Sequence, residues 1–289
     1  MWIGLLGSLR VRHEDVTLVV SAGKHRSLLA ALVTSAGDVV SFDQLAEIVW
    51  DGSPPGGSRV SLRNYVMRIR QLLGPEAGGR IVTAFPGYLF AAREDEVDLL
   101  AFEKLRQDGH AAARAQEWDR ASEVLAEALR LFRGTPLADI PSQRLRDAHV
   151  PHLAEARLLA QEARIDCDLR LGRSGQVTPE ILALAAKFPM REHLQALLMR
   201  ALHQQGRQAD ALAAYLNTRQ TIVEQLGIEP GRELRDIHQQ ILAGVPDPHI
   251  YRDTGTLPAH HRAPATCWGT PNGTAAFNSG AFAASGDIT

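Results

Sequence analysis

The chain has 289 residues, 45% of them apolar and 22% charged, and its 31 Lys and Arg against 33 Asp and Glu leave a net charge of −2. This balance excludes a uniformly basic nucleic-acid coat protein and an acidic disordered chain, although it permits a local basic face. The length is enough for two domains of ~100–200 residues each.

Cysteine usage and hydropathy indicate the cellular compartment of the protein. Cys167 and Cys267 lie far apart and form no C-x-x-C motif, so the sequence predicts neither a disulfide framework nor a zinc ribbon. The apolar N-terminus is soon interrupted by charges and has no basic residue before it, unlike a signal peptide. No apolar run approaches the ~18 residues of a membrane span. We therefore expect a cytoplasmic protein with no membrane partner.

The first 93 residues alternate short β-like and helical patterns. Ser41 and Gln44 form a capping box that opens a short helix. The Gly- and Pro-rich segment 51–57 is a loop, Ser58 is expected to cap the next helix, and Pro86-Gly87 is a hairpin turn. In chain order, the predicted elements are strands at 3–11 and 17–20, helices at 24–35, 42–50 and 59–73, and hairpin strands at 81–85 and 88–91. This order predicts a winged helix-turn-helix domain over residues 1–93.

Residues 97–244 show helical periodicity throughout and contain no convincing strand. The predicted helices are 99–116, 118–133, 143–171, 179–187, 191–205, 208–225 and 231–243. The triplets LGR at 171–173 and QGR at 205–207 each precede a helix and are 34 residues apart, which is the tetratricopeptide period. We therefore expect a mainly α protein, in which the winged helix is followed by an all-α, tetratricopeptide-like repeat domain. Residues 245–289 lack Lys and Glu and are predicted to form a disordered low-complexity tail.

The helix predicted at 59–73 carries the functional information. At about 100° per residue, one narrow stripe of this helix is apolar and must pack on the domain. The stripe consists of Leu62, Val66, Ile69 and Leu73; Ser61, Asn64 and Arg68 lie opposite it; and Arg59, Arg63 and Arg70 line one flank. Residues 59–80 hold five Arg and one acid, so this segment is basic within a nearly neutral chain.

Such a face matches the chemistry of reading DNA. Arg and Asn can make paired hydrogen bonds to guanine and adenine edges in the major groove, while flanking Arg residues neutralise phosphates. The alternative is an amphipathic helix whose arginines only face solvent. The helix at 59–73 lies between a capped helix and a hairpin, and this position favours DNA binding over that alternative.

The motifs of both zones, in their order, resemble a known family. The first zone has KHRSLLAAL at 24–32, VVS at 39–41, Trp50, NYVMRIR at 64–70, GRIVT at 79–83 and PGY at 86–88. The second has LAEAL at 125–129, GTPL at 134–137, LMRAL at 198–202, GRQADAL at 206–212 and LGIEPG at 226–231. They resemble the OmpR-type winged helix and the bacterial transcriptional activation domain of the Streptomyces antibiotic regulatory proteins.

The resemblance implies a transcriptional activator that binds direct repeats upstream of antibiotic or other secondary-metabolite genes. Its implied partners are double-stranded DNA, RNA polymerase holoenzyme with its sigma factor, and a second copy in a tandem dimer on the nucleoid. Carried over by position, Ser61, Asn64 and Arg68 would face bases, and phosphate contacts would come from Arg59, Arg63, Arg70, Thr83, Lys24 and Arg26. The loop with Asp51, Gly52, Ser53, Pro54 and Pro55 would touch polymerase. Ala84 stands where family wings often carry Arg, which argues against a minor-groove contact from the wing tip.

Two other functions stay open from the residues alone. One is a repressor, and the other is a helical-repeat interaction scaffold in which the DNA-binding domain is subsidiary. The glycine-rich segment 52–58 lacks the Gly-Lys-Ser/Thr of a phosphate loop, and neither a Gly-x-Ser-x-Gly nor a His-Glu-x-x-His motif occurs. We therefore expect no catalytic residues, no cofactor and no metal.

Overall fold

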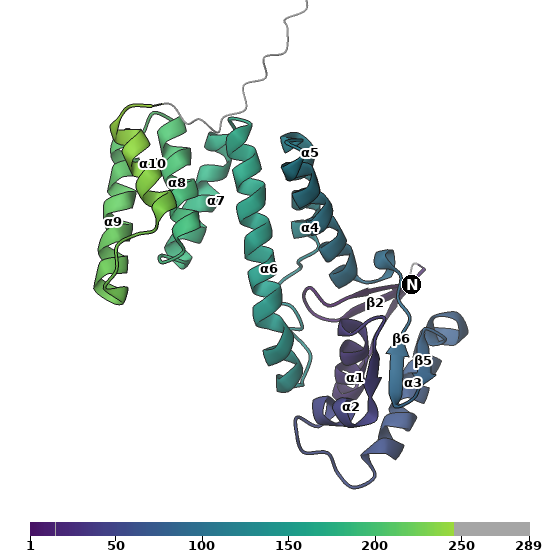
Figure 1. The fold of residues 1–289 in the computed structure, drawn as a ribbon. Coiled ribbons are helices and arrows are strands. Elements are labelled where there is room, and N and C mark those ends of the chain that lie inside the picture. Colours follow the sequence, from purple (N-terminus) through teal and green to yellow (C-terminus); the bar gives the residue numbers. More distant parts are fainter. Residues whose placement is uncertain (15, 246–289) are drawn as a thin grey trace, which may run out of the picture. The chain divides into compact units, whose positions relative to one another are not determined.

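The computed structural model describes residues 1–14 and 16–245, so the predicted tail at 245–289 lies almost wholly outside the described residues. The N-terminal part combines two three-stranded antiparallel sheets with three helices (Figure 1). One sheet has the order β1-β2-β3 and the other the order β4-β6-β5. The elements are β1 (Trp2–Gly4), β2 (Arg10–His13), β3 (Val16–Leu18), α1 (Gly23–Thr34), β4 (Val39–Ser41), α2 (Phe42–Val49), α3 (Ser58–Gly78), β5 (Ile81–Ala84) and β6 (Gly87–Phe90).

The rest of the described chain is helical, and each helix from α4 to α10 packs on the next in sequence. A short 3-10 turn, η1 (Glu94–Glu96), leads into this part. The helices are α4 (Asp98–Arg114), α5 (Trp118–Arg130), α6 (Gln143–Arg170), α7 (Ser174–Lys187), α8 (Glu192–Gln204), α9 (Gln208–Leu226) and α10 (Arg232–Leu242). The predicted fold class, a winged helix followed by a helical domain, is confirmed. None of the described helices is long and apolar enough to cross a membrane.

The core of the winged helix extends past the hairpin. Leu28, Leu32 and Ile69 are in one buried cluster with Leu137, Ile140 and Leu145, which follow α5 or begin α6. Residues far along the chain therefore complete the N-terminal core, and the described residues belong to one compact unit.

The segment predicted as one strand at 3–11 is two strands, so that prediction is wrong. Its middle does not pair with a strand, because its backbone bonds to the helical part instead. The amide of Leu9 donates to Asp139 Oδ1 (2.7 Å), and the carbonyls of Leu5 and Leu6 accept from the amides of Leu137 and Arg133. Long-range partners thus replace a local strand pairing.

Two helix starts also differ from the predictions. The Ser41–Gln44 capping box is present, but Ser58 is the first residue of α3 and not its cap. The cap is Gly57, whose φ of 85° is a conformation that glycine adopts at little cost. Helix α7 begins at Ser174 and not at 179, and the hydroxyl of Thr178 donates to the Ser174 carbonyl (2.7 Å) in the turn that precedes Pro179.

Candidate DNA interface

Helix α3 is held by its apolar stripe, as predicted. Leu62, Val66, Ile69 and Leu73 are buried, and the helix packs on α1 and α2. The helical conformation is interrupted at Gly74, whose φ is 82°, and Pro75 begins the final turn. The buried stripe fixes which residues of α3 face away from the domain.

The opposite face of α3 is open to solvent. Asn64 and Arg68 are exposed, Ser61 is half-buried, and two apolar residues lie beside them: Val60 (60% exposed) and Met67 (50% exposed). Within the described residues, the side chains of Asn64 and Arg68 form no hydrogen bond or ion pair. Their polar groups are thus available to an incoming ligand, and Val60 and Met67 add an apolar surface of the kind that contacts thymine methyl groups.

The flank of α3 meets α2 through aromatic and ionic contacts. Arg59 and Arg63 each lie 5.9 Å from the centroid of the Phe42 ring, and Arg59 also pairs with Asp43 (2.9 Å) at an exposed site. Arg63 has no ion pair within the part of the chain that the structure describes. Both guanidinium groups therefore present positive charge at the edge of the exposed face.

The basic residues at the start of α1 lie near α3, and aromatic rings connect the two helices. The Lys24 ammonium lies 4.5 Å from the Trp50 ring centroid, and Trp50 stacks on Tyr65 of α3. His25 contacts Tyr65 edge-on, and its pKa is lowered by burial and by nearby Arg68. Arg26 is half-buried and donates to the Ser21 carbonyl (3.3 Å), so it is less available than Lys24.

Arg70 connects the helix to the hairpin. Its Nε donates to the Ile81 carbonyl (3.0 Å), and its Nη2 donates to Thr83 Oγ1 (3.1 Å). Arg70 and Thr83, two of the predicted phosphate contacts, are therefore bonded to each other in the free protein. This arrangement positions the hairpin beside α3.

The loop predicted to touch polymerase is exposed, but its first residue has an internal role. Asp51 Oδ2 accepts from the Gln143 amide, and Oδ1 accepts from the Arg144 amide and the Ser142 hydroxyl, all at 3.1 Å. These bonds, the one from Arg144 first, lower the pKa of Asp51. Gly52 lies against the Arg144 side chain. Ser53, Pro54 and Pro55 remain as the free part of the loop.

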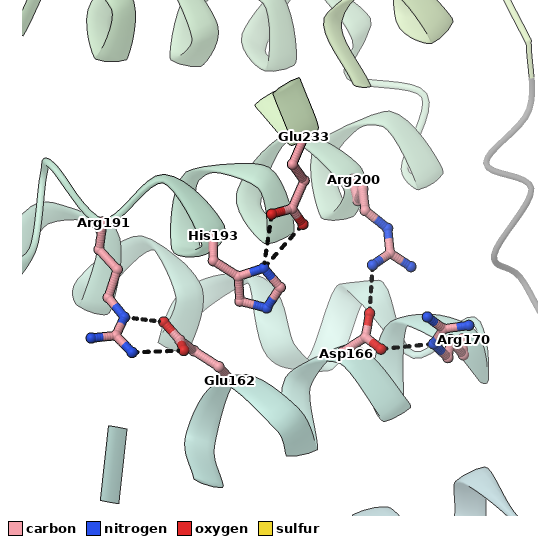
Figure 2. Close-up of polar contacts among 7 residues, drawn as sticks. All are labelled: Glu162, Asp166, Arg170, Arg191, His193, Arg200 and Glu233. Atoms are coloured by element: carbon pink, nitrogen blue, oxygen red, sulfur yellow. Dashed lines mark hydrogen bonds and ion pairs between the residues drawn. The ribbon is translucent and has the colours of Figure 1, made fainter. Parts of the chain in front are cut away.

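The helical part contains a charged groove that the sequence did not indicate. The groove has a volume of about 810 Å³ and is lined by residues of α4, α6, α8 and α10. Figure 2 shows its carboxylates in pairs: Glu162 with Arg191, Asp166 with Arg170 and Arg200, and Glu233 with His193. Glu162 and Arg200 are buried. Arg200 of α8 pairs with Asp166 of α6, and Arg191, just before α8, pairs with Glu162 of α6, so these two pairs tie α6 to α8. No sequence signal marked this cluster, because the pairs that join different helices are 29 to 40 positions apart, and only Asp166 and Arg170 are neighbours on one helix.

Among the residues that the structure describes, no group of three or more His, Cys, Asp or Glu could hold a metal ion. His260, His261 and Cys267, which are close together in the sequence, lie outside those residues.

Comparison with known proteins gives this architecture a family. Residues 97–242 match the bacterial transcriptional activator domain, and residues 17–90 match the C-terminal domain of transcriptional regulatory proteins. The chain is 36% identical over 267 residues to the regulatory protein DnrI of Streptomyces peucetius, covering 90% of this chain and 97% of DnrI. It is 33% identical over 272 residues to the transcriptional regulator RedD of Streptomyces coelicolor, covering 89% of this chain and 77% of RedD.

A solved structure agrees with the sequence relatives. Mycobacterium tuberculosis EmbR, in complex with a low-affinity phosphopeptide, superposes with a TM-score of 0.81 at 33% identity, covering 86% of this chain and 66% of that one. The fold and the exposed basic helix thus define a transcriptional regulator with an OmpR-type winged-helix DNA-binding domain and a helical activation domain. The chain belongs to the family of Streptomyces antibiotic regulatory proteins.

Proposed function

We propose that this protein is a transcriptional activator that binds direct repeats in promoters of biosynthetic genes and recruits RNA polymerase. The observation that carries the proposal is the exposed face of α3, where Asn64 and Arg68 have no polar partner among the described residues. A buried stripe fixes that face outward, and charged flanks accompany it. Ser61, Asn64 and Arg68 read bases, and Arg59, Arg63, Lys24 and Arg26 contact phosphates.

The size of one winged helix supports binding as two adjacent copies. A single recognition helix reads a short site, so useful affinity needs two copies side by side, and head-to-tail docking suits repeats in the same orientation. The exposed part of the loop, Ser53 to Pro55, contacts polymerase in this proposal, while the helical part supplies contacts between protomers or with the sigma factor.

The test uses the full chain with promoter DNA from the neighbourhood of its own gene. Footprinting is expected to show two protected segments in the same orientation, and run-off transcription with polymerase holoenzyme is expected to rise when the protein is added. Protection with decreased transcript would make the protein a repressor. Absence of any sequence-specific protection would leave the interaction-scaffold function.

The salt dependence of binding separates DNA binding from scaffold function more sharply. Neutralising phosphates releases counterions, so log affinity falls steeply with log salt concentration. A flat dependence would contradict the roles proposed for Arg59, Arg63 and Lys24.

A further inference from the structure

The charged groove of the helical part has the size of a small-molecule site. Its volume of about 810 Å³ lies within the range of about 300–1,000 Å³ that is usual for such sites. Four helices, α4, α6, α8 and α10, supply its walls, so the groove is a product of the tertiary fold and not of one loop. The DNA-binding function proposed above makes no use of it.

The carboxylates of this groove are already matched by basic side chains. Among the described residues, four carboxylates line the groove, and each accepts a hydrogen bond from a basic group: Glu162 from Arg191 (2.5 Å), Asp166 from Arg170 (2.7 Å) and Arg200 (2.5 Å), Glu233 from His193 (3.0 Å), and Asp236 from Arg232 (3.2 Å). The first three of these carboxylates are drawn in Figure 2. A cationic ligand would have to break one of these pairs, so the groove is poorly suited to it.

The wall formed by α4 has a different character. Arg106 and His110 lie one turn apart on this helix, and both line the groove. The Nε and Nη2 of Arg106 donate to Glu103 (2.9 and 2.7 Å), while its Nη1 forms no hydrogen bond among the described residues. The half-buried His110 ring has no hydrogen-bond partner in that part of the chain either, and burial, followed by nearby Arg106 and Arg114, lowers its pKa. The two arginines thus outweigh Glu103 around this ring, which favours an anion.

An apolar side chain lies in the same groove as these polar groups. Leu159 of α6 is 42% exposed, although it lines a concave site. Ala163, one turn further along α6, and Ile237 of α10 extend the apolar surface. A ligand that covers these side chains removes apolar area from water, which favours binding in proportion to the area covered. The groove therefore offers apolar contact together with a positively charged wall.

We propose that this groove binds a small organic carboxylate that has an apolar chain. The carboxylate pairs with Arg106 and accepts a hydrogen bond from the N–H of the His110 ring, and the apolar chain covers Leu159 and Ile237. Hydrogen bonds to an ionised partner are stronger than neutral ones, so Arg106 supplies most of the selection for charge. This site goes beyond the proposed DNA-binding function and does not depend on it.

Isothermal titration calorimetry of the full chain with octanoate and with octylammonium tests the selection for charge. The two probes share an aliphatic chain, and octanoate is expected to bind at least about tenfold more tightly. Arg106→Gln is expected to reduce the affinity for octanoate about tenfold, because a charge-assisted hydrogen bond is lost. Arg114→Gln removes an exposed arginine of the same helix that does not line the groove. It is the matched control and is expected to keep the affinity within about twofold, because solvent screens its charge.

A second variant tests the apolar contact separately from the charge. The wild type is expected to bind octanoate about tenfold more tightly than hexanoate, which is the gain from two buried methylene groups. Leu159→Ala changes a partly exposed site and is expected to reduce this ratio to about threefold. Methyl NMR signals that disappear in Leu159→Ala are expected to show nuclear Overhauser contacts to octanoate in the wild type.

Several results would overturn the inference. Octylammonium that binds as tightly as octanoate, or wild-type affinity in Arg106→Gln, would contradict the charged wall as the anion site. No binding of octanoate, an unchanged ratio in Leu159→Ala, or no Overhauser contact to Leu159 would remove the groove as the site. None of these results bears on DNA binding, whose failure would appear in the footprinting experiment instead.

Discussion

The carboxylate of Asp98, the first residue of α4, accepts two backbone hydrogen bonds: the Leu5 amide donates to Oδ1 (2.7 Å) and the Leu6 amide donates to Oδ2 (2.9 Å). Asp98 is fully buried, and Arg133 donates to its Oδ2 at 3.1 Å. These bonds explain why the chain leaves β1 at Gly4: the next two amides are satisfied by a helix 93 residues away. One side chain therefore links the N-terminal sheet to the start of the helical part.

Asp98→Ala is expected to lower the free energy of unfolding by about 3 kcal/mol, because it leaves two buried amides without acceptors at about 1–3 kcal/mol each. Urea unfolding followed by circular dichroism measures this loss. Asp108→Ala, which removes an exposed ion pair with Lys104 on the same helix, is the control and is expected to change the value by less than about 0.5 kcal/mol. Equal losses would show that the Asp98 bonds contribute no more than a surface pair.

The roles proposed for α3 in base reading and in phosphate contact can be tested separately. Arg68→Ala is expected to cost about 1–3 kcal/mol on a duplex selected by wild-type protein from a random-sequence library and to relax preference at one base pair. Arg63→Ala is expected to weaken binding to all sequences and to reduce the salt slope by about one. Competition between selected and random duplexes measures both effects. The same loss of specificity in the two variants would contradict the assignment of faces.

Local signals in the sequence were enough to predict much of α2 and α3. The Ser41–Gln44 capping box and the stripe of Leu62, Val66, Ile69 and Leu73 depend on residues within two turns of each other, and both are present. In contrast, the break after Gly4 and the role of Asp51 depend on partners more than 90 residues away. Periodicity carries no information about such pairs. The start of α3 was missed for a local reason, since a glycine in a left-handed conformation replaced the expected serine cap.

The core of the winged helix gives a third prediction. Ile69→Ala is expected to lower the free energy of unfolding by about 2–5 kcal/mol, because Ile69 is 1% exposed. Leu137 and Leu145 share its cluster, so hydrogen exchange at the start of α6 is expected to accelerate together with that of α1 and α3. Val60→Ala, at an exposed site of the same helix, is the control. Unchanged exchange near Leu145 would show that the helical part is independent of this core.

The groove in the helical part predicts a pH dependence. The hydrogen bond that the His193 ring donates to Glu233 is the first cause of the raised pKa of His193, while His193 lowers the pKa of Glu233. A raised histidine pKa stabilises the fold below about pH 6.5, and this stabilisation is lost as the pH rises through the folded value. Thermal unfolding of His193→Gln is therefore expected to show a lower Tm than wild type at pH 6 and a much smaller difference at pH 8.5. A constant difference across that range would mean that the ion pair is not the cause.

The loop at 51–55 provides the last prediction, because it combines an anchor with an exposed tip. Asp51 accepts from the amides of Gln143 and Arg144 and acts as a cap for α6, so Asp51→Ala is expected to cost about 1–2 kcal/mol of stability. The face of α3 is untouched by this change, so affinity for the selected duplex is expected to stay within about twofold. Run-off transcription is expected to fall, because Asp51 no longer anchors the loop to α6 and the exposed residues Ser53 and Pro54 that follow it lose their fixed position. Ser53→Ala, whose side chain has no hydrogen bond within the described residues, is expected to leave stability unchanged. If Asp51→Ala activates transcription as strongly as the wild type, the anchor has no role in the proposed polymerase contact.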